Sequence, residues 1–124
     1  MSGDVVIDSV ILIDHFNAVD EATAFLGSVG ETAAITVITR AEVLTGFETA
    51  DVPLACSLLD RFRLLVIDGP VADLAAALRR EHGWQLPDAL QAAAARRHGL
   101  RLATRNTEDF PPERYNFVDV PYTI

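Results

Sequence analysis

Short apolar runs alternate with amphipathic stretches along almost the whole chain. Runs at 5–7, 33–35, 64–67, 100–103 and 116–120 have the length of buried strands, and the run at 64–67 is strongly apolar. Spacing and end signals predict helices over 9–17, 21–28, 37–48, 53–62, 69–83 and 88–98. Strands that alternate with helices form parallel sheets covered on both faces. We therefore predict one α/β domain over 1–124, a three-layer α/β/α sandwich with a mostly parallel sheet of about five strands.

Charge is distributed unevenly along the 124 residues. The formal net charge is −8, from 18 acids and ten basic residues, and all ten basic residues are arginine. Residues 1–60 contain ten acids and only Arg40, whereas residues 61–124 contain eight acids and nine arginines. Such acidity argues against a general binder of nucleic acid or anionic membranes. The missing lysine excludes Schiff-base chemistry and a Walker-type phosphate site.

The cellular compartment is indicated by what the sequence lacks. One cysteine, Cys56, cannot form an internal disulfide, which suits a reducing cytosol. No apolar run approaches the roughly 20 residues that span a bilayer, and the first residues lack the basic start of a secretory signal. We expect a cytoplasmic protein without a membrane partner.

Sites in open parallel sheets form at the carboxyl ends of the strands. Asp8 follows the first strand, where a charge needs a partner or a metal, although capping the next helix explains it equally well. Glu42 falls in the second turn of a helix capped by Thr36, and a surface glutamate is the alternative. Asp88 begins a helix, where the helix dipole alone favours an acid.

A polar loop follows the fourth strand, at 104–110. Asn106 and Asp109 are common turn residues, and the sequence does not show whether Glu108 or Asp109 faces inward. Three or four carboxylates gathered at one sheet edge would repel strongly unless cations neutralised them. Oxygen ligands without a His or Cys cluster suit Mg²⁺ or Mn²⁺, and two such ions activate water against a phosphodiester.

Four segments together resemble the PIN domain family, specifically its VapC-type toxins, over nearly the whole chain. They are VIDSVILID at 6–14, ITRAEVL at 38–44, LPDALQAA at 86–93 and LATRNTEDF at 102–110. The resemblance implies a PIN-like sandwich and a Mg²⁺- or Mn²⁺-dependent endoribonuclease that cleaves structured cellular RNA. It also implies a VapB-type antitoxin as partner and a homodimer, which assembles with the antitoxin into a heterotetramer or larger complex.

The resemblance also assigns roles to residues. Asp8, Glu42 and Asp88 would form the acidic metal-binding triad, with Asn106 as a further ligand and Asp109 as an assisting acid. Thr104 and Ser9 would support the site. The chain departs from the family pattern at two positions: Val10 replaces a polar residue, and Asn106 stands where Asp is common. These departures leave open a catalytically weak or inactive PIN-like scaffold that mainly binds protein.

Several arginines, a tryptophan and a further acid lie within the four segments or between them. Arginines concentrate around Asp88 and could bind RNA phosphates, and a solvated helix face is the alternative. These arginines are Arg79, Arg80, Arg96, Arg97 and Arg105. Trp84 is interpreted as a loop anchor, with stacking on an RNA base as the alternative. Asp14 is expected to be solvated.

Two other functional classes fit the sequence poorly. A receiver domain needs a lysine, and a haloacid-dehalogenase-type phosphatase needs Asp-x-Asp where this chain has Asp8-Ser9-Val10.

A partner surface is predicted from surplus apolar residues on two helices. A groove for an antitoxin helix is expected between them. Its residues would be Val37, Val43, Leu44 and Phe47 on the first helix, and Leu54, Leu58, Leu59 and Phe62 on the second.

Overall fold

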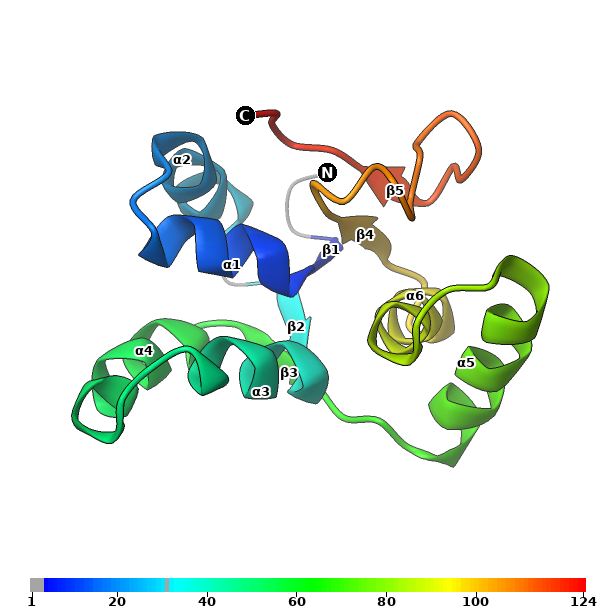
Figure 1. Ribbon diagram of the computed structural model, residues 1–124, viewed down its shortest axis with the longest axis horizontal. Helices are drawn as coiled ribbons and strands as arrows, with labels where there is room; N and C mark the ends of the chain where they lie inside the picture. Colours follow the sequence, from blue (N-terminus) through cyan, green and yellow to red (C-terminus); the bar gives the residue numbers. More distant parts are fainter. Residues whose placement is uncertain (1–3, 31) are drawn as a thin grey trace.

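The computed structural model describes residues 4–30 and 32–124, which form a five-stranded sheet with helices on both faces (Figure 1). The strands are β1 (Val5–Ile7), β2 (Ala34–Thr36), β3 (Arg63–Leu65), β4 (Arg101–Ala103) and β5 (Val118–Asp119). They lie in the order β3-β2-β1-β4-β5, and every pairing is parallel. Val6 of the central strand lies opposite Ala34 on one side and Leu102 on the other. The predicted five-stranded parallel sheet is confirmed.

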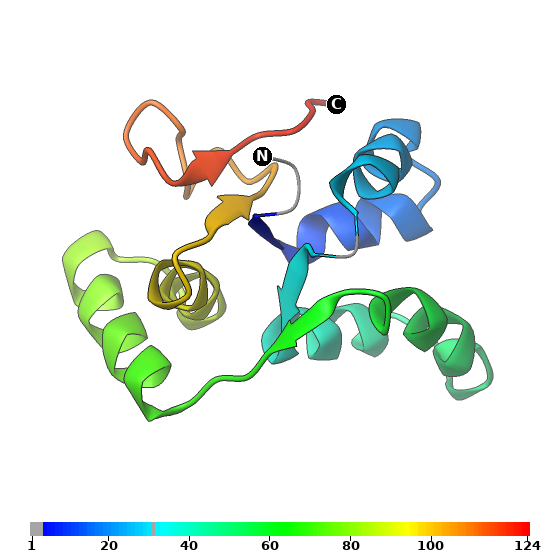
Figure 2. The same cartoon turned by 180° about the vertical axis from the view of Figure 1, so that it is seen from behind.

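The helices form the two outer layers (Figures 1 and 2). They are α1 (Ser9–Phe16), α2 (Asp20–Val29), α3 (Val37–Thr45), α4 (Val52–Leu59), α5 (Gly69–His82) and α6 (Leu86–Arg97). Side chains alternate along a strand, so Val5 and Ile7 pack in one core with α1–α4 while Val6 packs in the other with α5 and α6. The predicted three-layer sandwich is confirmed.

The predicted strand at 64–67 is the main error of the sequence analysis. The observed β3 (Arg63–Leu65) is an edge strand, and only Leu65 in it is buried. Leu64 is 45% exposed and Val66 is 60% exposed, because an edge strand has a neighbour on one side only. The chain then runs without regular structure to the start of α5 (Figure 2).

Two predicted helices are shorter than expected. The helix predicted over 37–48 ends at Thr45, where Gly46 caps it, and the helix predicted over 53–62 is α4 (Val52–Leu59). No helix in the described part of the chain is long and apolar enough to cross a membrane.

Three helix starts determine where a site can form. Asp8 directly follows β1 and Thr36 is the last residue of β2, and their side chains cap α1 and α3. The starts of α1, α3 and α6 consequently lie together around the centre of Figure 1, beside the carboxyl ends of the central strands. Each helix can present a side chain from its first two turns to the same hollow.

Candidate active site

An open cleft of about 500 Å³ lies at the carboxyl ends of the central strands. Four acidic side chains from four different segments of the chain reach it, whereas its only basic lining residue is an arginine. The lining residues are Asp8, Ser9, Val10, Glu42, Asp88, Arg105, Asn106, Thr107 and Glu108. The structure thus brings together the three acids of the predicted triad with Ser9 and Asn106.

Asp8 is held rigidly at the floor of the cleft. It is 5% exposed, and its Oδ1 accepts a hydrogen bond of 2.8 Å from the backbone N–H of Ser9. The hydroxyl of Thr104 donates to the other carboxylate oxygen at 2.7 Å. Burial raises the pKa of Asp8, and these hydrogen bonds oppose the rise. Asp8 therefore caps α1 and also lines the cleft, so the two interpretations of this residue coexist.

Gln91 connects Asp8 to the start of α3, and the sequence analysis missed it. Its side chain is 1% exposed, and its Nε2 donates to Oδ1 of Asp8 at 3.3 Å and to the hydroxyl of Thr39. Its Oε1 accepts a hydrogen bond of 2.7 Å from Thr36. One buried amide thus joins three elements around one carboxylate. The sequence did contain a signal for this role, because Gln91 is a polar residue within the alanine-rich segment that forms α6. A fully buried polar side chain needs several hydrogen-bond partners.

Glu42 and Asp88 reach the cleft from two different helices. Thr36 accepts a hydrogen bond of 3.1 Å from the N–H of Thr39, so Glu42 belongs to the second turn of α3, where it is exposed. Asp88 lies in the first turn of α6. Burial, together with the negative charges of Asp8, Asp109 and Glu42, raises the pKa of Asp88 to about 6. The four carboxylates are therefore close enough to repel one another.

The loop after β4 presents Asn106 and Glu108 to the cleft, which settles the choice between Glu108 and Asp109 that the sequence left open. Asn106 lines the cleft, but its Nδ2 donates to Oδ2 of Asp109 at 2.9 Å and its Oδ1 accepts from the N–H of Asp109 at 3.3 Å. Thr104 also accepts a hydrogen bond of 3.0 Å from the N–H of Asn106. Glu108, not Asp109, lines the cleft, so Asp109 acts on the site through Asn106 and through its charge and hydrogen bonding at Asp88.

The donor set fits a hard divalent cation. The cleft offers carboxylate and amide oxygens, the ligands that Mg²⁺ and Mn²⁺ prefer, and its acids carry unbalanced negative charge. Within the described residues, no three His, Cys, Asp or Glu side chains already converge closely enough to hold an ion. Glu42 is exposed and Asp88 is only half-buried, so both side chains have room to turn toward a cation.

Arg105 and Asp14 form an ion pair that the sequence analysis did not foresee. The guanidinium of Arg105 donates to the two carboxylate oxygens of Asp14 at 2.7 and 2.9 Å, and the hydroxyl of Tyr122 donates to the same carboxylate at 2.7 Å. Asp14 is 5% exposed, so its predicted solvation is wrong. The pKa of Asp14 is lowered, first by the hydrogen bonds from Arg105. The charge of Arg105 is consequently paired with Asp14, while its side chain stays 29% exposed at the cleft.

The other four arginines of interest separate into two pairs. Arg79 and Arg80 end α5 beside Trp84 and the start of α6, whereas Arg96 and Arg97 end α6, in the last turn farthest from Asp88. Trp84 is 5% exposed and its indole N–H donates to the backbone oxygen of Asp109 at 3.0 Å. Its role as a loop anchor is confirmed, because a ring this buried offers no face to an RNA base.

Comparisons with known proteins agree with this geometry. The family model described as PIN domain matches residues 5–111. Ribonuclease VapC10 of Mycobacterium tuberculosis is 35% identical over 114 residues, which cover 86% of each chain. A chain of a toxin–antitoxin complex from Klebsiella pneumoniae superposes with a TM-score of 0.90 at 36% identity, covering 97% of this chain and 99% of that one. A chain of FitAcB from Neisseria gonorrhoeae gives 0.77 at 26% identity, covering 94% and 97%.

The family model spans most of the sequence, and the ribonuclease relative matches both chains almost end to end. The cleft in turn gathers the acids of the predicted motifs at the expected end of the sheet. The protein belongs to the PIN domain family.

Proposed function

We propose that the protein is a metal-dependent endoribonuclease toxin that cleaves structured cellular RNA in the cytoplasm and is neutralised by a VapB-type antitoxin. The observation that carries this proposal is the cleft, in which Asp8, Glu42 and Asp88 come from three helix starts to one place. The ribonuclease relative and the toxin–antitoxin complex support the same activity and the same class of partner.

Each residue of the cleft has a definite task in this proposal. Asp8, Glu42 and Asp88 would hold the cation, with Asn106 contributing its amide oxygen. A bound Mg²⁺ or Mn²⁺ would supply an activated water and stabilise the charge that develops on the phosphodiester. Thr104 and Ser9 keep Asp8 in one orientation through their hydrogen bonds.

Asp109 would assist from just outside the cleft. It orients the amide of Asn106 and contributes negative charge next to Asp88.

Cleavage of RNA with purified protein tests the proposal directly. We expect cleavage that requires Mg²⁺ or Mn²⁺ and that is lost in Asp8→Asn and Asp88→Asn proteins. Asp73→Asn removes one exposed acid of α5 that does not line the cleft, so it is a matched control that should cleave normally. Full cleavage by the Asp8 and Asp88 variants, purified free of contaminating nuclease, would contradict the assignment of the site.

A catalytically weak scaffold is the second candidate, because two observations favour it. Val10 places an apolar side chain in the cleft, and both polar atoms of the Asn106 amide already have partners in the loop. Isothermal titration with Mn²⁺ separates the two candidates. A cleft that binds no Mn²⁺ at millimolar concentration supports the scaffold, whereas binding that disappears in Asp88→Asn supports the nuclease.

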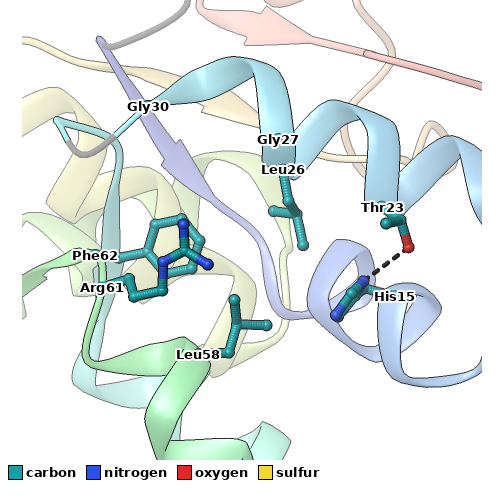
Figure 3. Close-up of a pocket in the computed structure, with 8 residues that line it drawn as sticks. All are labelled: His15, Thr23, Leu26, Gly27, Gly30, Leu58, Arg61 and Phe62. Atoms are coloured by element: carbon teal, nitrogen blue, oxygen red, sulfur yellow. Dashed lines mark hydrogen bonds between the residues drawn. The ribbon is translucent and has the colours of Figure 1, made fainter.

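The structure changes the set of residues that can form the predicted antitoxin groove. Leu59 is 1% exposed and belongs to the core, whereas Val43 is 2% exposed and lines the same hollow as Phe47. Leu58 and Phe62 do line a largely apolar hollow of about 260 Å³, together with Leu26 of α2 (Figure 3). Phe47 lies in a different hollow, beside Phe16 and Ile13 of α1. We propose the hollow of Figure 3 as the seat of the antitoxin helix.

Two leucines of α4 give a matched test of that seat. Leu58→Asp places a charge in the hollow, whereas Leu54→Asp changes a residue that is 71% exposed and does not line it. We expect Leu58→Asp to lose a co-expressed antitoxin and Leu54→Asp to retain it. Retention by both variants would place the antitoxin elsewhere.

The assembly state is a separate part of the proposal. We propose a homodimer that binds antitoxin as a heterotetramer or larger complex, and light scattering of the purified protein and complex measures both masses.

A further inference from the structure

A pair of arginines lies at the end of α5, next to the start of α6. Arg79 and Arg80 lie in the last turn of α5, and both are exposed. They line an open hollow of about 510 Å³ together with Trp84 and Leu86. Leu86 is 51% exposed and is the first residue of α6, the helix that carries Asp88 in its first turn.

The structure holds Arg79 at a fixed place relative to the cleft. Its Nε donates to the backbone oxygen of Trp84 at 3.2 Å, and the indole of Trp84 donates to the backbone oxygen of Asp109 at 3.0 Å. The carboxylate of Asp109 in turn accepts the 2.9 Å hydrogen bond from Asn106, which lines the cleft. Because Trp84 is buried among aromatic side chains, this chain of contacts ties the arginine to the loop beside the cleft.

The charges of this pair are not used inside the described part of the protein. Arg40, Arg101 and Arg105 each form a salt bridge with a carboxylate, but neither Arg79 nor Arg80 does so among the described residues. The helix dipole favours basic residues in the last turn of any helix, so it explains Arg96 and Arg97 of α6 equally well. The pair on α5 also lines a hollow together with Leu86, the first residue of the helix that carries Asp88.

We propose that Arg79 and Arg80 bind backbone phosphates of the RNA strand next to the bond that is cut. This inference rests on the proposed nuclease function and adds to it the path that the bound RNA strand follows away from the cleft. Guanidinium groups bind phosphates through paired hydrogen bonds, and the exposed Leu86 provides an apolar surface on which a base or ribose can lie between the arginines and Asp88.

The net charge is consistent with such a localised contact. The chain carries −8 overall, so it cannot hold RNA through a general basic surface. A cut site flanked by two unpaired arginines instead gives a local attraction, which acts together with the cation in the cleft.

Binding of a labelled single-stranded RNA oligonucleotide in EDTA, where cleavage is prevented, tests this inference by fluorescence anisotropy. The main variant is Arg80→Gln, since no side-chain hydrogen bond to Arg80 occurs in the described structure, and Arg79→Gln is the second. Arg97→Gln is the matched control, because it removes the same charge from the last turn of the neighbouring helix.

We expect Arg80→Gln and Arg79→Gln each to weaken RNA binding by roughly threefold to tenfold, and the slope of log K against log salt to fall by about 0.7 for each lost phosphate contact. In cleavage assays with Mn²⁺, KM should rise while kcat stays unchanged, since neither arginine reaches the acids of the cleft. Arg97→Gln should match the parent protein, and circular dichroism should confirm that every variant is folded.

The outcomes separate this inference from the proposed function. If the parent protein cleaves RNA but the Arg79 and Arg80 variants match Arg97→Gln in RNA affinity and in salt slope, the arginine assignment is overturned and the nuclease proposal stands. If the protein binds RNA through Arg80 but never cleaves it, the result supports phosphate binding by the arginines and contradicts the proposed nuclease function. A parent protein that binds no RNA would overturn the inference.

Discussion

Replacing Asp88 by asparagine should stabilise the metal-free protein while destroying its metal site. The pKa of Asp88 is about 6 in the folded protein, against an ordinary value of 3.8, because of burial and the negative charges of Asp8, Asp109 and Glu42. The folded state therefore binds this proton more tightly than the unfolded state. The resulting penalty is absent below about pH 4 and grows as the pH rises toward 6.

The size of the effect follows from the same pKa values. A change from 3.8 to about 6 corresponds to about 3 kcal/mol at neutral pH as an upper bound. Solvent screening of this half-buried side chain lowers the figure, and asparagine also loses about 0.3–1 kcal/mol of favourable interaction with the start of α6. We expect Asp88→Asn to gain about 1–2 kcal/mol in free energy of unfolding at pH 7.5, or roughly 3–8 °C in Tm.

Urea unfolding in EDTA at pH 7.5 and at pH 4.5 measures this gain, with Asp73→Asn as the control for removing one negative charge. The gain should shrink at pH 4.5, where Asp88 of the folded protein is mostly protonated. Excess Mn²⁺ at pH 7.5 should reverse the order, because only the parent protein keeps the complete ligand set. A variant that is no more stable than the parent at pH 7.5, or equally stabilised at both pH values, would refute the reasoning.

Three further predictions concern the polar groups around the cleft. Gln91→Leu should lower the free energy of unfolding by about 2–4 kcal/mol in urea, because it removes one hydrogen bond from buried Asp8 and leaves the hydroxyls of Thr36 and Thr39 without their amide partner, and it should weaken Mn²⁺ binding in calorimetry. Asp14→Asn should cost about 1–3 kcal/mol at pH 7. Since the folded pKa of Asp14 is lowered, its contribution is present above pH 3.8 and is lost as the pH falls further, so the two proteins should converge in acid. Trp84→Phe should cost about 1 kcal/mol through its lost hydrogen bond to Asp109, measured in the same urea assay.

The sequence determined the local structure of this protein to a large extent. Short apolar runs predicted all five strands, and Asp8 and Thr36 marked the starts of α1 and α3, because a capping side chain acts on backbone groups only two or three residues away. Acids placed after strands were enough to indicate one sheet edge as the site. The apolar run at 64–67 misled the prediction, since hydrophobicity does not say whether a strand lies at the centre or the edge of its sheet.

The tertiary structure alone decided which polar groups meet. Arg105 and Asp14 are 91 residues apart and Gln91 and Asp8 are 83 residues apart, so no local pattern could pair them. Their meeting depends on β1 and β4 being neighbours and on α6 packing against the central strand. The same packing paired Arg105 with Asp14 beside the cleft and left Arg79 and Arg80 exposed at the end of α5. A buried charge or amide must find its partner wherever the fold brings one, and that partner is fixed by the order of the strands rather than by the spacing of residues along the chain.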